Sequence, residues 1–123
     1  MGILGVGEGT WPTMRNTLQK IGISEQHFLT TCDASFKQGT SFHNWLDEKV
    51  EHQYYHPFSL PLDYPNAALG SWWQHYQGQQ SFAHSTTSQA TLCDHFRAPK
   101  QLQTPPFAGV VNYGYHLDAN KFA

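Results

Sequence analysis

The chain has 123 residues, a formal net charge of −2, 13% charged residues and 15% aromatic residues. This length has room for one domain, and the small negative charge gives no electrostatic reason to expect nucleic acid or an anionic membrane as a partner. No apolar run approaches the ~20 residues that a membrane-spanning helix needs, and so many aromatic residues with so few charges predict a ligand cleft or further protein that covers apolar surface.

The two cysteines, Cys32 and Cys93, bear on the cellular compartment. The N-terminal residues do not show a basic region followed by an apolar one, so we expect no signal peptide. Two cysteines without a secretory signal favour free thiols in a reducing environment. The sequence therefore predicts a cytoplasmic protein.

The N-terminal segment contains closely spaced glycines. Gly5 and Gly7 have the first spacing of the dinucleotide-binding pattern G-x-G-x-x-G, but Thr10 stands where the third glycine should be. The residues alone therefore predict a turn before a helix. We expect Thr10 to cap this helix, which runs from about residue 11 to 20 and ends at Gly22.

A second helix is predicted from about Ser24 to Thr31, followed by one bent strand or two short strands. In this stretch Phe36 and Phe42 share one parity, so Lys37 points away from both of them. If the phenylalanines enter a core, Lys37 projects toward a cleft or toward solvent. The pattern alone favours a solvent-exposed lysine, and Gly39 permits a bulge or a close backbone approach.

The middle of the chain is rich in aromatic residues and histidines. His52 and His56 are four residues apart, which on a helix would place them on one face, but Pro57 disfavours a helix there. No Cys-x-x-Cys or His-Glu-x-x-His pattern occurs either. We therefore expect no metal site.

The C-terminal half is predicted to contain further helices and loops. We expect a helix over residues 66 to about 77 and helical parts within 81–98, followed by a loop to residue 106. Asp118 is expected to cap a short final helix that begins at Ala119. Together the elements predict a mixed α/β or α+β fold.

Four segments of the sequence resemble the flavin-dependent tryptophan halogenases. The first resembles the strap of that family, Val-Gly-Glu-Ala-Thr-x-Pro, and here reads Val6-Gly7-Glu8-Gly9-Thr10-x-Pro12. The second resembles the segment with the essential lysine and reads Ser35-Phe36-Lys37, then Ser41-Phe42-His43-Asn44-Trp45, with Ser41 in place of a second lysine. The third resembles the family's Tyr-His-x-Phe and reads Tyr55-His56-x-Phe58. The fourth, residues 113–119, resembles a Tyr-His-x-Asp-Ala turn that many halogenases and related flavin monooxygenases share, and the resemblance implies a turn there.

The resemblance implies an enzyme that uses reduced FAD, oxygen and chloride or bromide to halogenate an electron-rich aromatic compound such as tryptophan or indole. A separate flavin reductase would supply the reduced FAD. Lys37 would deliver the halogen, while His56 and Phe58 would line the substrate pocket. The residues expected beside the flavin are Val6, Gly7, Glu8, Gly9 and Thr10. We also expect residues 8–12 and 54–58 to lie close to Lys37.

The resemblance further implies that residues 1–123 are an internal fragment of an FAD-binding, halogenase- or monooxygenase-like fold. The fragment would be truncated at both ends, lacking the G-x-G-x-x-G unit and the C-terminal part, and would be inactive alone. One alternative is a non-catalytic module that binds an aromatic ligand or a flavin, favoured if the gene ends at Ala123. Another is a flavin monooxygenase that hydroxylates, against which Lys37 argues.

Overall fold

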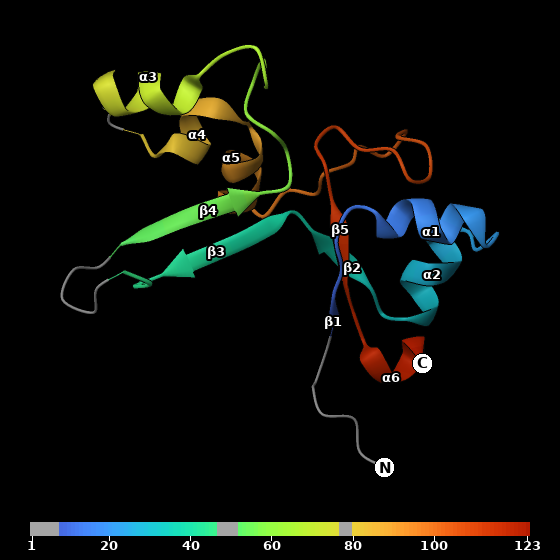
Figure 1. Ribbon diagram of the computed structural model, residues 1–123. Helices are drawn as coiled ribbons and strands as arrows, with labels where there is room; N and C mark the ends of the chain where they lie inside the picture. The colour runs from blue at the N-terminus through green and yellow to red at the C-terminus, as the bar shows by residue number, and fades with distance from the viewer. Residues whose placement is uncertain (1–7, 47–51, 77–79) are drawn as a thin grey trace. The chain divides into compact units, whose positions relative to one another are not determined.

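The computed structural model describes residues 8–46, 52–76 and 80–123 (Figure 1). The described residues combine helices with short antiparallel strands, which confirms the predicted mixed α/β fold class. The elements, in chain order, are β1 (Glu8–Gly9), α1 (Met14–Lys20), α2 (Glu25–Thr31), β2 (Ser35–Lys37), β3 (Gly39–His43), β4 (Gln53–Pro57), α3 (Leu69–Tyr76), α4 (Phe82–Thr86), α5 (Gln89–Asp94), β5 (Gly114–Leu117) and α6 (Ala119–Phe122). None of these helices is long and apolar enough to cross a membrane.

The chain divides into two compact units. The first comprises Met1–Gln38 and Ala98–Ala123, and the second comprises Gly39–Arg97. Of the two alternatives predicted around Lys37, one bent strand or two short strands, the structure has two strands. β2 belongs to the first unit and β3 to the second.

The first unit is built on a three-stranded antiparallel sheet in the order β1-β5-β2. Its register pairs Gly9 with His116 on one side of β5, and Lys37 with Gly114 on the other. The predicted turn over residues 113–119 is wrong for residues 114–117, which form the middle strand. The strand partners of β5 lie 77 to 109 residues earlier in the chain, so no local pattern identifies the pairing.

One face of this sheet packs against α1 and α2, which Figure 1 shows on the same side of the strands. Leu18 of α1 and Phe28 of α2 are buried with Tyr115 and Leu117 of β5. The Phe28 and Tyr115 rings meet edge to face with their centroids 4.9 Å apart. Each fully buried side chain of this size stabilises the fold by about 1.5–3 kcal/mol, so this layer holds β5 in place.

The prediction that Thr10 caps α1 is wrong. The helix begins at Met14 rather than near residue 11, and its N-cap residue is Thr13. Thr10 instead continues the edge of the sheet: its backbone amide donates to the Tyr115 carbonyl at 2.8 Å, and its Oγ1 accepts from the Tyr115 amide at 3.0 Å. The residues that we expected to form only a turn before α1 thus begin with strand β1.

The predicted end of α1 is confirmed. Gly22 has a φ of +78°, a left-handed conformation that glycine adopts at little cost. The Ile23 amide then donates to the Leu18 carbonyl at 3.0 Å, and the Gly22 amide donates to the Gln19 carbonyl at 3.2 Å. These two bonds form a Schellman motif. The chain then turns into α2, where the Ser24 side chain accepts from the His27 amide.

The second unit contains a two-stranded antiparallel sheet and three helices. Strands β3 and β4 pair Gly39 with Pro57 and Phe42 with Tyr54, whose rings stack with centroids 4.9 Å apart. His56 therefore lies on a strand, as the argument from Pro57 predicted. Helix α3 confirms the helix predicted over residues 66–77, although it begins only at Leu69, and α4 and α5 confirm the helical parts predicted within 81–98.

The short final helix α6 is also as predicted. Its N-cap is Asp118, whose carboxylate accepts from the Asn120 amide at 2.8 Å. Lys121 lies in its last turn, where a positive charge is favourable. The helix follows β5 directly, and the Asp118 amide donates to the Cys32 carbonyl at 3.0 Å, which joins the end of the strand to the region after α2.

Candidate functional site

Lys37 is the last residue of β2 and lies on the sheet face that points away from α1 and α2. Its neighbour Phe36 packs into the core, where its ring centroid is 5.1 Å from that of Tyr113 and 6.4 Å from that of Tyr115. Because side chains alternate along a strand, Lys37 points to the opposite face. Lys37 is half-buried there, so the fully exposed lysine that the pattern alone favours is not what the fold produces.

Glycines on the neighbouring strands make room for the Lys37 side chain. Gly114, its register partner on β5, has no space for a side chain, because a Cβ would lie 2.5 Å from the Thr10 carbonyl oxygen. A Cβ on Gly9 of β1 would lie 3.0 Å from Lys37 Nζ and 3.5 Å from Lys37 Cδ. The lysine thus crosses β5 above a glycine-lined surface, and its amine ends beside β1.

Two further side chains border the amine. His116 Nδ1 is 3.6 Å from the same Cβ position on Gly9 that Lys37 Nζ approaches. The amine also lies 6.0 Å from the ring centroid of Trp11, at the outer limit of a cation–π contact. His116 is exposed, but the protein around its ring removes part of its hydration; this loss, and then the nearby charge of Lys37, lower the pKa of His116 below its ordinary value. The imidazole is therefore neutral at neutral pH.

The described part of the predicted flavin strap lies beside this amine. Gly9 and Trp11 are its direct neighbours, which agrees with the prediction that residues 8–12 lie close to Lys37. Glu8 is exposed and pairs with Leu117, and Thr10 is held by Tyr115. Val6 and Gly7 lie outside the described residues.

The predicted substrate residues His56 and Phe58 belong to the second unit. His56 is an exposed residue of β4, and Phe58 follows that strand and is partly buried. His56 borders a cavity of about 260 Å³, whose other walls include Leu60 and Phe82. His56 and Phe58 lie in a different unit from Lys37, so their closeness to Lys37 stays a prediction.

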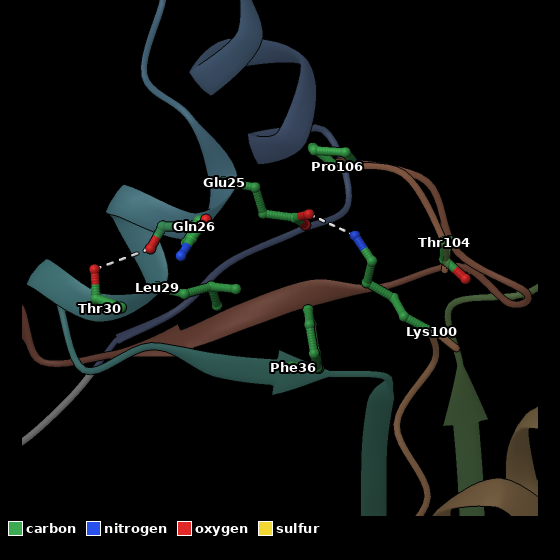
Figure 2. A pocket seen from close by; sticks show the side chains of 8 residues that line it. All are labelled: Glu25, Gln26, Leu29, Thr30, Phe36, Lys100, Thr104 and Pro106. Carbon is green, nitrogen blue, oxygen red and sulfur yellow. Dashed lines mark hydrogen bonds and ion pairs between the residues drawn. The ribbon is translucent and has the colours of Figure 1, made fainter. Parts of the chain in front are cut away.

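Glu25, for which the sequence offers no local signal, forms a buried ionic cluster in the first unit (Figure 2). Its side chain is 4% exposed and accepts from Lys100 Nζ at 2.5 Å, from the Phe107 amide at 2.8 Å and from the Tyr115 hydroxyl at 2.9 Å. The Tyr113 hydroxyl donates a fourth hydrogen bond. The partners lie 75 to 90 residues away, so no local spacing could have revealed them.

The four donors keep Glu25 ionised despite its burial. Burial by itself raises the pKa of this carboxyl, but the hydrogen bonds, with that of Lys100 foremost, bring the pKa below its ordinary value. Burial and the hydrogen bond to Glu25 raise the pKa values of Tyr113 and Tyr115. A cavity of about 320 Å³ adjoins the cluster and is bordered by Leu29 and Phe36 (Figure 2). Since Glu25 already has four donors, we assign the cluster to stability.

A second polar cluster, also missed, ties β4 to α4 and α5 in the second unit. Asp94 accepts from the Tyr55 hydroxyl at 2.6 Å and pairs with His84 Nε2 at 2.7 Å, while His84 Nδ1 lies 2.6 Å from Ser81 Oγ. The hydrogen bond to Asp94, with burial, raises the pKa of Tyr55 to about 12. The hydrogen bonds from Tyr55 and His84 lower the pKa of Asp94.

The other predicted features concern metals and thiols. Among the residues that the structure describes, no group of three or more His, Cys, Asp or Glu side chains is placed to hold a metal ion. Cys32 and Cys93 are both free thiols, the first buried and the second half-buried. Burial, and then the charge of Asp94, raise the pKa of Cys93, which makes it a poor nucleophile at neutral pH.

Comparison with known proteins places these features in one family. The family profile described as tryptophan halogenase matches residues 1–123. Tryptophan 7-halogenase RebH from Lentzea aerocolonigenes is 29% identical over 98% of this chain, which corresponds to 25% of RebH. The 7-chloro-L-tryptophan 6-halogenase KtzR from a Kutzneria species is 30% identical over 83% of this chain and 19% of its own length.

Solved structures show the same likeness. A tryptophan halogenase from Shewanella frigidimarina has a TM-score of 0.89 and 47% identity, over 99% of this chain and 24% of that one. Xcc4156, a flavin-dependent halogenase from Xanthomonas campestris, has a TM-score of 0.77 and 28% identity, over 99% of this chain and 24% of its own. The chain therefore spans about a fifth to a quarter of the length of these relatives.

Proposed function

The chain belongs to the tryptophan halogenase family, and from this premise we propose that it is the part of a flavin-dependent halogenase that carries the halogen-delivering lysine, Lys37. The observation that carries the proposal is the position of the Lys37 amine. It lies half-buried over the glycine-lined face of the sheet, beside Gly9 of the strap-like segment. An ordinary surface lysine needs no such glycines, whereas an amine that receives a reactive halogen species must be held in one place.

The proposed cofactor is FAD, beside residues 6–10. When bound in reduced form, FAD would supply the reaction with oxygen that oxidises chloride or bromide. The described part of this segment suits such a neighbour, because Gly9 is exposed and has no side chain, so a flat ring system can approach its backbone. Glu8, Gly9 and Thr10 would lie along the ring together with Val6 and Gly7, and the hydrogen bonds of Thr10 to Tyr115 would keep the segment rigid.

The chemistry of Lys37 follows from its amine. As an ammonium group it donates hydrogen bonds to an oxidised halogen species and makes it more electrophilic; as a free amine it can carry the halogen covalently. Arginine can do neither in the same way, because guanidinium stays protonated and has a different shape. Delivery from a fixed amine would direct the halogen to one position on the substrate.

The proposed substrate is an electron-rich aromatic compound such as tryptophan or indole. Phe58 offers a ring for stacking, and His56 offers a hydrogen-bonding group beside it on the chain. The cavity of about 260 Å³ next to His56 is slightly smaller than most pockets for drug-sized ligands, which start near 300 Å³. We propose that a separate flavin reductase supplies the reduced FAD and that the enzyme is cytoplasmic.

The test is an assay of the full-length gene product with FAD, NADH, a flavin reductase, oxygen, bromide or chloride, and tryptophan or indole. We expect a product whose mass shows one halogen for one hydrogen and whose formation stops when the halide or the reductase is omitted. A hydroxylated product that forms without halide would instead identify a monooxygenase. Binding of an aromatic ligand without turnover under any of these conditions would identify a binding module.

A further inference from the structure

His116 and Lys37 meet over one point of the sheet. Gly9 pairs with His116, and Lys37 reaches the same glycine from the far side of β5. Lys37 Nζ is 3.0 Å and His116 Nδ1 is 3.6 Å from the position of a Cβ on Gly9. The two nitrogen atoms therefore lie no farther apart than the sum of these distances. At such a separation two positive charges repel each other, and water around the exposed His116 weakens this repulsion without removing it.

The surroundings of His116 leave Lys37 as its main electrostatic neighbour among the described residues. Its register partners are Gly9 on β1 and Ser35 on β2, neither of which carries a charge. Glu8 is next to Gly9 but pairs with Leu117, so its side chain points to the other face of the strand. The influences that lower the pKa of His116 are likewise the loss of hydration first and the charge of Lys37 second.

We propose that His116 is a positioning residue for Lys37: its neutral imidazole borders the place of the amine over Gly9, and a protonated imidazole displaces the ammonium group from it. The expected effect on halogenation rests on the proposed function, whereas the expected repulsion does not. The repulsion itself is a property of the two side chains. Lys37 therefore delivers the halogen while the His116 imidazole is neutral, and acidification protonates the imidazole and ends this state.

The displacement predicts a specific effect of pH. As pH falls through the lowered pKa of His116, a second positive charge forms beside the Lys37 ammonium. The amine can relieve the repulsion by swinging away from Gly9, since the lysine side chain is long and flexible. Halogenation should then fall with pH while oxidation of reduced FAD continues, because only delivery depends on the place of the amine.

The first measurement is an NMR titration of the histidine rings in the 123-residue chain, with the His116 signal assigned by its absence in His116→Gln. We expect the midpoint of His116 to rise by several tenths of a pH unit in Lys37→Met and in Lys37→Gln. Lys20→Met removes an exposed charge at the end of α1 and should leave it unchanged. An unchanged midpoint in both Lys37 variants would overturn the proposal, whatever the outcome of any halogenation assay.

The second measurement compares His116 variants of the full-length enzyme by the ratio of halogenated product to reduced FAD consumed. His116→Gln stays neutral and should keep the ratio near the wild-type value down to the acid end of the range. His116→Lys carries a permanent charge and should lower the ratio tenfold or more at neutral pH. A ratio that falls equally in both variants would show a merely structural role and would contradict the proposal.

Discussion

Glu25 is a buried carboxylate that receives hydrogen bonds from two distant parts of the first unit. Lys100 and the Phe107 amide come from the loop after residue 98, and Tyr113 and Tyr115 come from the end of the chain. Taking the Glu25–Lys100 pair out of water has a cost that only good geometry offsets. Removing one partner is worse than removing both, because it leaves the other charge buried alone.

We predict that Glu25→Gln lowers the free energy of unfolding by about 3–5 kcal/mol, since the Lys100 ammonium group loses its counter-ion in a buried place. Asp33→Asn is the matched control, because Asp33 pairs with Lys121 at the surface. That pair is exposed and should contribute little to stability. Urea denaturation of the two variants measures both values, and similar small losses would show that the buried cluster is unimportant.

The same residue predicts a dependence of stability on pH. The folded-state pKa of Glu25 is lower than its ordinary value of 4.5. Ionised Glu25 therefore stabilises the fold above that ordinary value, and the contribution disappears as pH falls through the lowered folded-state pKa. Glu25→Gln should lose less stability than the wild type over this acidic window. Equal acid sensitivity of the two proteins would contradict this interpretation.

At the scale of single residues, the sequence predicted that the Lys37 side chain points away from Phe36, but it did not predict which residues surround Lys37. Alternation with Phe36 is a local property, and the fold bears it out. The contacts of Lys37 with Gly9 and His116 depend on the pairing of β5 with two strands that lie far away in the sequence. Glu25 was missed for the same reason, since all of its hydrogen-bond donors come from distant segments.

At the scale of elements, the hairpin of β3 and β4 depends on a close approach at Gly39. A Cβ there would lie 2.5 Å from the His56 carbonyl oxygen and 2.9 Å from Pro57 Cα, both of them backbone atoms that cannot turn aside. The sequence correctly anticipated a close backbone approach at this glycine. Gly70, in contrast, is a residue of α3 with no atom within 4 Å of the position of a Cβ.

We predict that Gly39→Ala destabilises the second unit by about 1–3 kcal/mol, the usual cost of forcing atoms into a packed site. Gly70→Ala should instead stabilise it by about 0.5–1 kcal/mol, because alanine favours a helix more than glycine does. Both variants add one methyl group, so thermal unfolding of the pair isolates the effect of the site. A Gly39→Ala protein as stable as Gly70→Ala would refute the close approach.

The elements that the sequence predicted are those with local signals. Gly22 ends α1, Asp118 caps α6, and Pro57 marks an extended segment, all as expected. The missed elements, β1 and β5, are short and gain their stability from each other and from β2. The Thr10 cap failed because sheet pairing with Tyr115 competes for the same hydroxyl group.

At the scale of the whole molecule, FAD binding tests how much of the cofactor site lies in these residues. The glycine pattern at the N-terminal end is incomplete, with Thr10 in the place of the third glycine. That pattern normally brings the amides of a helix N-terminus to the pyrophosphate. We therefore predict only weak binding of FAD to the 123-residue chain, measured by flavin fluorescence or calorimetry. Stoichiometric binding at submicromolar FAD would mean that the cofactor site is misplaced.

Much of the family assignment could be predicted from the sequence, because motifs such as Tyr55-His56-x-Phe58 are local strings of residues. The arrangement of residues within the first unit could not be, since it depends on the pairing of β5 with β1 and β2, which no short segment encodes. The roles proposed for Lys37, His56 and Phe58 rest on those motifs and on the fold of each unit.

The most direct test of the central claim is the ratio of halogenated product to reduced FAD consumed in the full-length enzyme with Lys37→Met. The variant keeps a side chain of similar length and loses the amine, so halogenation should be abolished while oxidation of reduced FAD continues at nearly the wild-type rate. Lys37→Arg should fail in the same way, and Lys20→Met, at the exposed end of α1, should behave as the wild type. Wild-type amounts of halogenated product from Lys37→Met would contradict the account.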